Sequence, residues 1–271
     1  MHHFDNFPPN PLTLEGAALL HQMLKVRWPQ WRALPSARRD EILAAAAPVL
    51  ASLENKKSAA FSLLGHKGDL MLVHFRDNFD ELGQVERDLQ KLALWDYLEL
   101  SHSYLSVVEL GLYESTMKVY STLAEKSVEP HTPEWEQEIL ETLQRQGAAM
   151  QPRLFPEIPA HPYVCFYPMD RLRGEHKNWY SVPLAERQRM MADHGAIGRR
   201  YAGRVKQIIS GSIGFDDWEW GVDLFAEDPV VFKQLIYEMR FDEVSAVYAK
   251  FGSFFIGKRT PGSEMGKLLS V

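Results

Sequence analysis

The sequence predicts an α+β fold made of two tandem ferredoxin-like units, each with the element order β-α-β-β-α-β. Short apolar runs rich in β-branched and aromatic residues alternate with longer helical segments, in the same order in both halves. A proline-rich stretch separates the halves, which gives the boundaries 1–113, 114–162 and 163–271. Two such units can pair their antiparallel sheets edge to edge and leave their helices outside, because pairing covers strand edges that would otherwise be exposed.

The first half follows this order. We expect these elements: a strand in the first part of 14–31, a helix over 35–53, strands over 59–64 and 70–75 around a turn at 65–69, a helix over 78–94, and a strand over 103–110. Pro35 suits the first turn of its helix, and the alanine run that follows has high helix propensity. Pro48 predicts a kink or an early end of that helix.

The connector, residues 114–162, differs in composition from both halves. Its prolines are Pro130, Pro133, Pro152, Pro156, Pro159 and Pro162. Because proline disrupts helix interiors, only one short helix is expected here, over about 134–145.

The second half repeats the pattern without repeating the sequence. We expect these elements: a strand over 163–167, a charged loop over 170–178, a helix over 183–201, a hairpin over 205–210 and 219–225, helical residues over 229–238 and 244–248, and a strand over 254–257. This similarity of pattern supports a duplicated architecture.

Composition limits the classes of function. The chain has 271 residues, 45% of them hydrophobic, which is enough for a large core. A formal net charge of −6 argues against nonspecific binding to nucleic acid or to anionic membranes. The single cysteine, Cys165, cannot form an internal disulfide, which suits the cytoplasm. No apolar run reaches membrane-spanning length, and the sequence MHHFDNFPPNP at 1–11 lacks the regions of a signal peptide.

One histidine stands out on the helix at 183–201. Met190, His194, Ile197 and Tyr201 share one helix face, which is apolar except for the imidazole. A histidine so placed can be an axial haem ligand, although a hydrogen-bonded core histidine is the more common case.

Several short sequence motifs resemble those of the coproheme decarboxylases, the peroxide-dependent haem synthases of the chlorite dismutase superfamily. The matching motifs are YPMD at 167–170, NWY at 178–180, HGAIGR at 194–199, QIISGSIGFDDWEWG at 207–221 and EMRFDEVSA at 238–246. They cover about the last 120 residues in order, and the first 100 residues resemble the family more loosely. The resemblance implies a dimeric α+β barrel with haem in the second half.

The resemblance also assigns roles to residues at matching positions. His194 matches the proximal ligand of the haem iron, and Tyr167 matches the tyrosine whose radical attacks a propionate. Arg153, Met169 and Ser245 fall where the family contacts the substrate. By residue type alone, each is more often a core or surface residue.

Three further positions refine the comparison. Arg171 replaces the usual lysine and keeps the charge, but it holds its proton more firmly, so a proton-donating role of that lysine is in doubt. Gln207 stands where chlorite dismutases carry an arginine, and a neutral amide stabilises an oxyanion less well. Trp179 matches a tryptophan near the haem, where simple packing is its expected role.

Taken together, the resemblance implies oxidative decarboxylation of two propionates of coproheme III (Fe-coproporphyrin III) by hydrogen peroxide, giving haem b. It also implies a homopentamer and allows a transient contact with a coproporphyrin ferrochelatase. Two alternatives remain at this point: a chlorite dismutase, and a haem carrier or sensor without turnover.

Overall fold

A computed structural model of the chain describes residues 6–55 and 57–270. Its strands are β1 (Thr13–Val26), β2 (Ser58–Leu64), β3 (Leu70–Arg76), β4 (Leu98–Gly111), β5 (Tyr163–Arg171), β6 (Lys206–Gly211), β7 (Trp220–Ala226), β8 (Ala249–Phe251) and β9 (Phe255–Arg259). Its α-helices are α1 (Trp28–Ala33), α2 (Ser36–Glu54), α3 (Phe79–Gln90), α4 (Tyr113–Glu125), α5 (Pro133–Leu154), α6 (Leu184–Arg200), α7 (Val230–Met239), α8 (Glu243–Tyr248) and α9 (Met265–Leu269). Short 3₁₀ helices are η1 (Ala93–Tyr97), η2 (Trp179–Ser181) and η3 (Gly262–Glu264). Part of the segment considered for a signal peptide, residues 1–5, lies outside the described residues.

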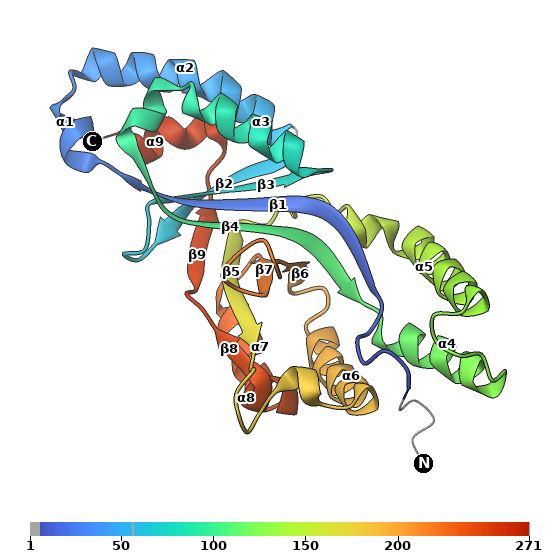
Figure 1. Cartoon of the computed structure of the whole chain (residues 1–271). Helices are drawn as coiled ribbons and strands as arrows, with labels where there is room; N and C mark the ends of the chain where they lie inside the picture. Colours follow the sequence, from blue (N-terminus) through green and yellow to red (C-terminus); the bar gives the residue numbers. More distant parts are fainter. Residues whose placement is uncertain (1–5, 56, 271) are drawn as a thin grey trace.

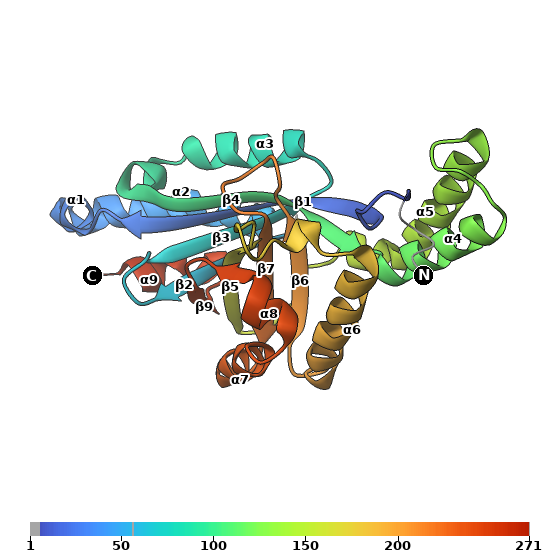
Figure 2. The same cartoon turned by 60° about the horizontal axis from the view of Figure 1, so that its bottom comes forward.

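The strands form one antiparallel sheet that closes on itself (Figures 1 and 2). Their order is β7-β6-β4-β1-β3-β2-β9-β5-β8, and β5 pairs in addition with β7, which completes the ring. Within this ring β4-β1-β3-β2 and β9-β5-β7-β6 are two ferredoxin-like sheets. The pairs β4–β6 and β2–β9 join them at both edges. The predicted α+β barrel of two tandem units is confirmed.

Aromatic and aliphatic side chains from both halves fill the barrel interior. Phe61, Phe75, Phe166 and Phe225 are among its fully buried members. Alternate residues of each strand face inward, so the other set faces the helices. A strand such as β5 therefore contributes to the barrel core and to an outer layer at the same time.

Each half has its own outer layer of helices. In the first half α2 and α3 cover the sheet, and α2 continues through Pro48 to Glu54, so the predicted early end is wrong and the kink stays a prediction. Ile42, Ala46 and Leu50 of α2 are buried against the sheet. In the second half α7 packs on the sheet, whereas α6 contacts α4, α7 and α8.

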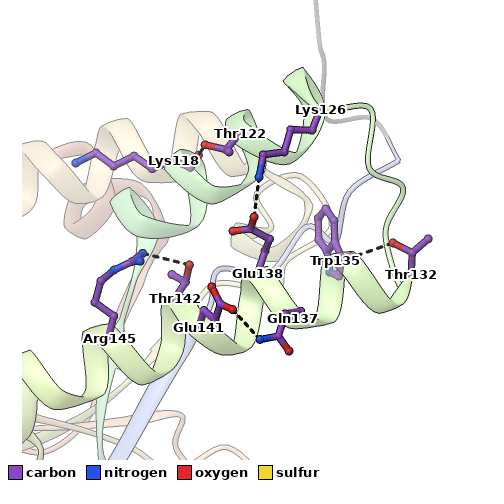
Figure 3. A network of polar contacts seen from close by, with 10 residues as sticks. All are labelled: Lys118, Thr122, Lys126, Thr132, Trp135, Gln137, Glu138, Glu141, Thr142 and Arg145. Carbon is purple, nitrogen blue, oxygen red and sulfur yellow. Dashed lines mark hydrogen bonds and ion pairs between the residues drawn. The ribbon is translucent and has the colours of Figure 1, made fainter.

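The connector contains two helices, α4 and α5, which correct the prediction of one short helix at 134–145. Pro133 occupies the first turn of the 22-residue α5, where its missing N–H is harmless, and Pro152 lies in the last turn. Thr132 caps α5 by accepting a hydrogen bond from the Trp135 N–H, at 3.3 Å (Figure 3). Lys126 of the α4–α5 turn forms an ion pair with a glutamate of α5 across the helical hairpin. Pro133 therefore marks the start of a helix, whereas Pro156, Pro159 and Pro162 lie in an irregular segment between α5 and β5.

No helix among the described residues is long and apolar enough to cross a membrane.

Candidate functional site

Helix α6 is loosely packed for an element of its length. Of its 17 residues only Arg187 and Met190 are buried, whereas the ten-residue α7 buries four. The strand face next to it is also incompletely covered, because Gln207 is exposed and Ile209 is 39% exposed. These two residues pair in register with Leu224 and Val222, which lie on the outer face of β7. An apolar strand face beside a helix that does not cover it can accept a flat ligand.

His194 on α6 is held by a carboxylate. Its Nδ1 donates to Oδ2 of Asp242 at 2.9 Å, and its side chain remains 20% exposed. Asp242 is itself buried and caps α8, because its Oδ1 accepts the backbone N–H of Ser245 at 2.8 Å. No described residue forms a hydrogen bond with the other ring nitrogen, Nε2, so a neutral imidazole that donates through Nδ1 offers the Nε2 lone pair to a metal. This is the arrangement by which a carboxylate fixes the orientation of a metal-binding imidazole.

The carboxyl of Asp242 stays ionised in this position. Burial alone would raise its pKa, but the hydrogen bond from His194 and the bonds from Ser245 together lower the pKa below its usual value. The Ser245 hydroxyl donates to the same Oδ2 atom at 3.2 Å. The structure therefore places Ser245 directly behind His194, and its hydroxyl proton is already engaged.

Tyr167 lies on the outer face of β5, together with Cys165 and Met169. It is 5% exposed, and its ring packs against Phe254 at 4.6 Å between centroids. Burial raises the pKa of its phenol, the neighbouring thiol raises it further, and the positive charges of Arg240 and Arg171 offset part of this effect. The phenol is therefore protonated at neutral pH, and no described residue forms a hydrogen bond with its hydroxyl.

Arg171 ends β5 close to Trp179. Its guanidinium lies 5.1 Å from the Trp179 ring centre, and Nη2 lies 3.8 Å from Sδ of Met191 on α6. Burial lowers the pKa of the guanidinium, an effect that the nearby Tyr113 and Asp242 oppose. Within the described chain, no carboxylate comes within ion-pair distance of this guanidinium.

Arg153 is the predicted site residue that the structure leaves apart from the others. It lies exposed in the last turn of α5, where Nη1 contacts Sδ of Met150 at 3.7 Å. It makes no hydrogen bond or ion pair with Tyr167, His194 or Arg171. The other predicted residues gather on the outer face of β5–β7 and on the elements beside it, α6, η2 and α8.

Sequence reasoning missed three residues of this region. Asp242 lies in the matching motif EMRFDEVSA, but its hydrogen-bond partner, His194, is 48 residues away in the sequence. Tyr113, at the start of α4, belongs to the other half of the chain and packs in one cluster with Trp179. Arg187 could have been found, because it precedes His194 by seven residues and therefore shares its helix face.

The donor set suits a metal that arrives with most of its ligands. In the described chain, no group of three or more histidine, cysteine, aspartate or glutamate side chains could hold a metal ion. His194 offers one free nitrogen, and Arg171 offers a cation without a protein counter-charge. One axial nitrogen and cations for carboxylates are what an iron porphyrin requires of its protein.

The chain is similar to a known protein family and to solved structures. A family model described as chlorite dismutase matches residues 39–260. A heme-binding protein from Thermus thermophilus is 38% identical in sequence, with a TM-score of 0.81, over 98% of this chain and 100% of that one. Two mutant chlorite dismutases from Candidatus Nitrospira defluvii are more distant. One is 17% identical with a TM-score of 0.68, over 94% of both chains, and the other is 18% identical with a TM-score of 0.70, over 96% of this chain and 98% of that chain. These two share the fold.

Proposed function

Because this chain belongs to the chlorite dismutase family, we propose that it binds coproheme between α6 and the outer face of β5–β7 and converts it to haem b with hydrogen peroxide. The observation that carries this proposal is the pairing of His194 with Asp242 on a loosely packed helix beside the strand that holds Tyr167. The 38% identity to a heme-binding protein supports the porphyrin itself. The sequence motifs around Tyr167 support coproheme as the substrate.

The residues of the chain have distinct roles in this reaction. His194 binds the iron through Nε2, and Asp242 keeps the proton on Nδ1 and the ring in place. A bound iron porphyrin supplies the oxidising power of peroxide. Tyr167 gives up one electron and one proton, and the resulting phenoxyl takes a hydrogen atom from the propionate carbon next to the ring. Loss of a second electron and of carbon dioxide then leaves a vinyl group.

The overall step balances with peroxide as the oxidant. Each propionate, one hydrogen peroxide and one proton give one vinyl group, one carbon dioxide and two waters. Two propionates react, so two peroxides are consumed for each haem b. The buried, protonated phenol of Tyr167 suits this step, because a tyrosine that starts neutral loses its electron and its proton together.

The substrate carries four propionates, and the proposed contacts supply cations and polar groups for them. We assign Arg153, Arg171 and Ser245 to the carboxylates, and Met169 and Gln207 to the rest of the porphyrin, with Trp179 packing at its edge. Arg171 lies beside Trp179 without a carboxylate partner, which supports its assignment. The Ser245 hydroxyl proton is engaged by Asp242, so this side chain can take part only as an acceptor or after its bond is exchanged.

One experiment separates the proposal from its alternatives. The protein is loaded with coproheme, peroxide is added, and the product masses are followed. Successive losses of two carboxyl groups support the decarboxylase, whereas tight binding without turnover indicates a carrier or sensor. His194→Ala should weaken coproheme binding and change the visible spectrum, and an unchanged spectrum would exclude His194 as the ligand.

A chlorite dismutase remains the second enzymatic candidate, because the family match covers residues 39–260. Gln207 argues against it, since a neutral amide stabilises a chlorine oxyanion less than an arginine does. An oxygen electrode measures this directly, and rapid, sustained oxygen release from chlorite would favour the dismutase.

We also propose that the chain forms a homopentamer in the cytoplasm and transfers porphyrin through transient contact with a coproporphyrin ferrochelatase. The family resemblance supports these assignments. Light scattering that finds only monomer at micromolar concentration would contradict the first of them.

A further inference from the structure

Two buried polar side chains of the first half each have one atom without a hydrogen bond. Gln22 on β1 is 2% exposed and His74 on β3 is 1% exposed. Oε1 of Gln22 and Nε2 of His74 have no hydrogen-bond partner within the described chain. Helix α3 packs on both strands (Figures 1 and 2). A buried polar atom without a partner costs free energy, so each of these atoms requires one.

The sheet brings the two atoms to one region. In the antiparallel register Gln22 lies opposite Leu72, and Leu20 lies opposite His74. Gln22 and His74 are therefore diagonal neighbours on the same face, with their Cα atoms about 7–8 Å apart, which is within reach of long side chains. Leu82 of α3 packs against Leu20 on this face. The two unpaired atoms thus belong to one buried region beneath α3.

The contacts of the other ring nitrogen determine the tautomer of His74. Nδ1 of His74 lies 2.7 Å from the Ser58 hydroxyl oxygen, and Nη2 of Arg76 donates to the same oxygen at 2.9 Å. Because a guanidinium only donates, the Ser58 hydroxyl accepts from Arg76 and directs its own proton to Nδ1. Burial, followed by the charges of Arg76 and His21, lowers the pKa of His74 to about 3, so the imidazole is neutral and its proton lies on Nε2.

The amide of Gln22 is oriented in the same way by its other contact. Nε2 of Gln22 donates to Oε1 of Glu86 on α3 at 3.4 Å. A carboxylate only accepts, so the amide nitrogen faces Glu86 and the amide oxygen is left as an acceptor. His74 therefore presents a donor and Gln22 an acceptor to the same buried region. A water molecule can accept from the first and donate to the second.

We propose that one internal water molecule joins Nε2 of His74 to Oε1 of Gln22. The water completes a chain of hydrogen bonds that runs from Arg76 through Ser58, His74 and Gln22 to Glu86, with every donor pointing the same way. Arg76 is 7% exposed and forms no ion pair among the described residues. The chain connects this buried cation to a carboxylate of α3 through neutral groups that polarise one another, and so it holds α3 to the sheet. This inference is independent of the proposed function.

A high-resolution crystal structure of the porphyrin-free protein tests the water directly. We expect a density peak about 2.7–3.2 Å from both atoms. Nitrogen NMR of protein with isotope-labelled histidine should show His74 as the neutral tautomer protonated at Nε2. The absence of a peak, a direct bond between the two side chains, or a tautomer protonated at Nδ1 would overturn the proposal.

A double-mutant cycle tests whether the chain acts as a unit. Gln22 and Ser58 form no bond with each other, so Gln22→Met and Ser58→Ala should be independent unless His74 and the water connect them. In denaturant titrations the double variant should differ from the product of the single effects on the unfolding equilibrium constant by about twofold or more.

The control is Gln84→Met, which removes an exposed amide of α3 that donates to Asp88. Combined with Ser58→Ala, it should give the product of the two single effects. If Gln22→Met and Ser58→Ala also combine as a simple product, the chain is wrong. Should these variants fail to fold, the crystal structure and the NMR tautomer of the wild type decide the proposal.

Discussion

Tyr167→Phe removes one oxygen atom from the centre of the candidate site. The ring keeps its contacts with Phe254 at 4.6 Å and Phe251 at 5.8 Å, because both are contacts of the ring. A hydroxyl with one protein hydrogen bond would cost about 1 kcal/mol to remove. The hydroxyl forms no hydrogen bond with another described residue and is not among the fully buried polar atoms, so its removal should change the free energy of unfolding by less than about 1 kcal/mol in either direction.

The effect on turnover should be of a different size. Phenylalanine cannot lose an electron and a proton to form a phenoxyl, so decarboxylation should fall by at least roughly 10²-fold, the loss typical of removing a group that transfers a proton. Binding should change little, because His194 and Arg171 are untouched. Mass spectrometry after peroxide addition measures turnover, and absorbance titration with coproheme measures affinity.

Tyr163→Phe provides a matched control. Tyr163 lies on the same face of the same strand, four residues before Tyr167, and is only partly buried. Removal of the Tyr163 hydroxyl should leave turnover unchanged. If Tyr167→Phe produces haem b at the wild-type rate, the radical role is wrong and another oxidisable residue, such as Trp179, has to be considered. If both variants lose turnover equally, the loss reflects general damage to this strand.

Two further predictions concern the partner of His194 and a buried histidine of the first half. Asp242→Asn should keep the His194 ring in place but make the imidazole less basic. Coproheme affinity or turnover should then fall by roughly 10- to 100-fold, with a shift in the visible spectrum. Unchanged binding, turnover and spectrum would contradict this role of Asp242. The imidazole of His74 is buried in the first half of the chain. This burial, followed by the charges of Arg76 and His21, lowers the pKa of His74 to about 3. Below pH 6.5 the folded protein therefore binds one proton less than the unfolded chain. Stability is therefore lost as pH falls, by about 2 kcal/mol between pH 6.5 and pH 5, and His74→Gln should remove this part of the slope in denaturant titrations.

The fold was largely predictable from the sequence because it depends on local periodicity. The nearly continuous apolar run at 70–75 and the glycine-containing turn before it predicted β3 to within one residue. The order of elements was readable in both halves for the same reason. Closure of the barrel through the β5–β7 and β4–β6 pairs could only be inferred from the need to cover strand edges.

The errors concern proline, which occurs both in helices and in loops. Pro133 and Pro152 suggested an irregular connector, but Pro133 lies in the first turn of α5, where proline is tolerated, and Pro152 lies within the last turn although it cannot donate the backbone hydrogen bond of that position. Pro48 suggested a kink or an early end of α2, and the early end is wrong because the helix continues for six residues beyond it. Composition alone does not distinguish a proline at a helix end from one in a loop.

The candidate site was predicted only in part, because some of its contacts join residues that lie far apart in the sequence. His194 was identified by its place on a helix face and by the surrounding sequence. Its carboxylate partner, Asp242, could not be identified from spacing, since it belongs to the cap of another helix. Arg187 shares a helix face with His194, but its residue type is that of a solvated charge, and its burial became apparent only in the structure.

Comparison of the two halves explains why only one of them offers a site. Helix α2 occupies the position in the first half that α6 occupies in the second, and it places Ile42, Ala46 and Leu50 against the sheet. Helix α6 has Arg187 and His194 on one face, and it buries only two of its 17 residues. The same duplicated framework therefore gives a packed layer in one half and an incompletely covered face in the other.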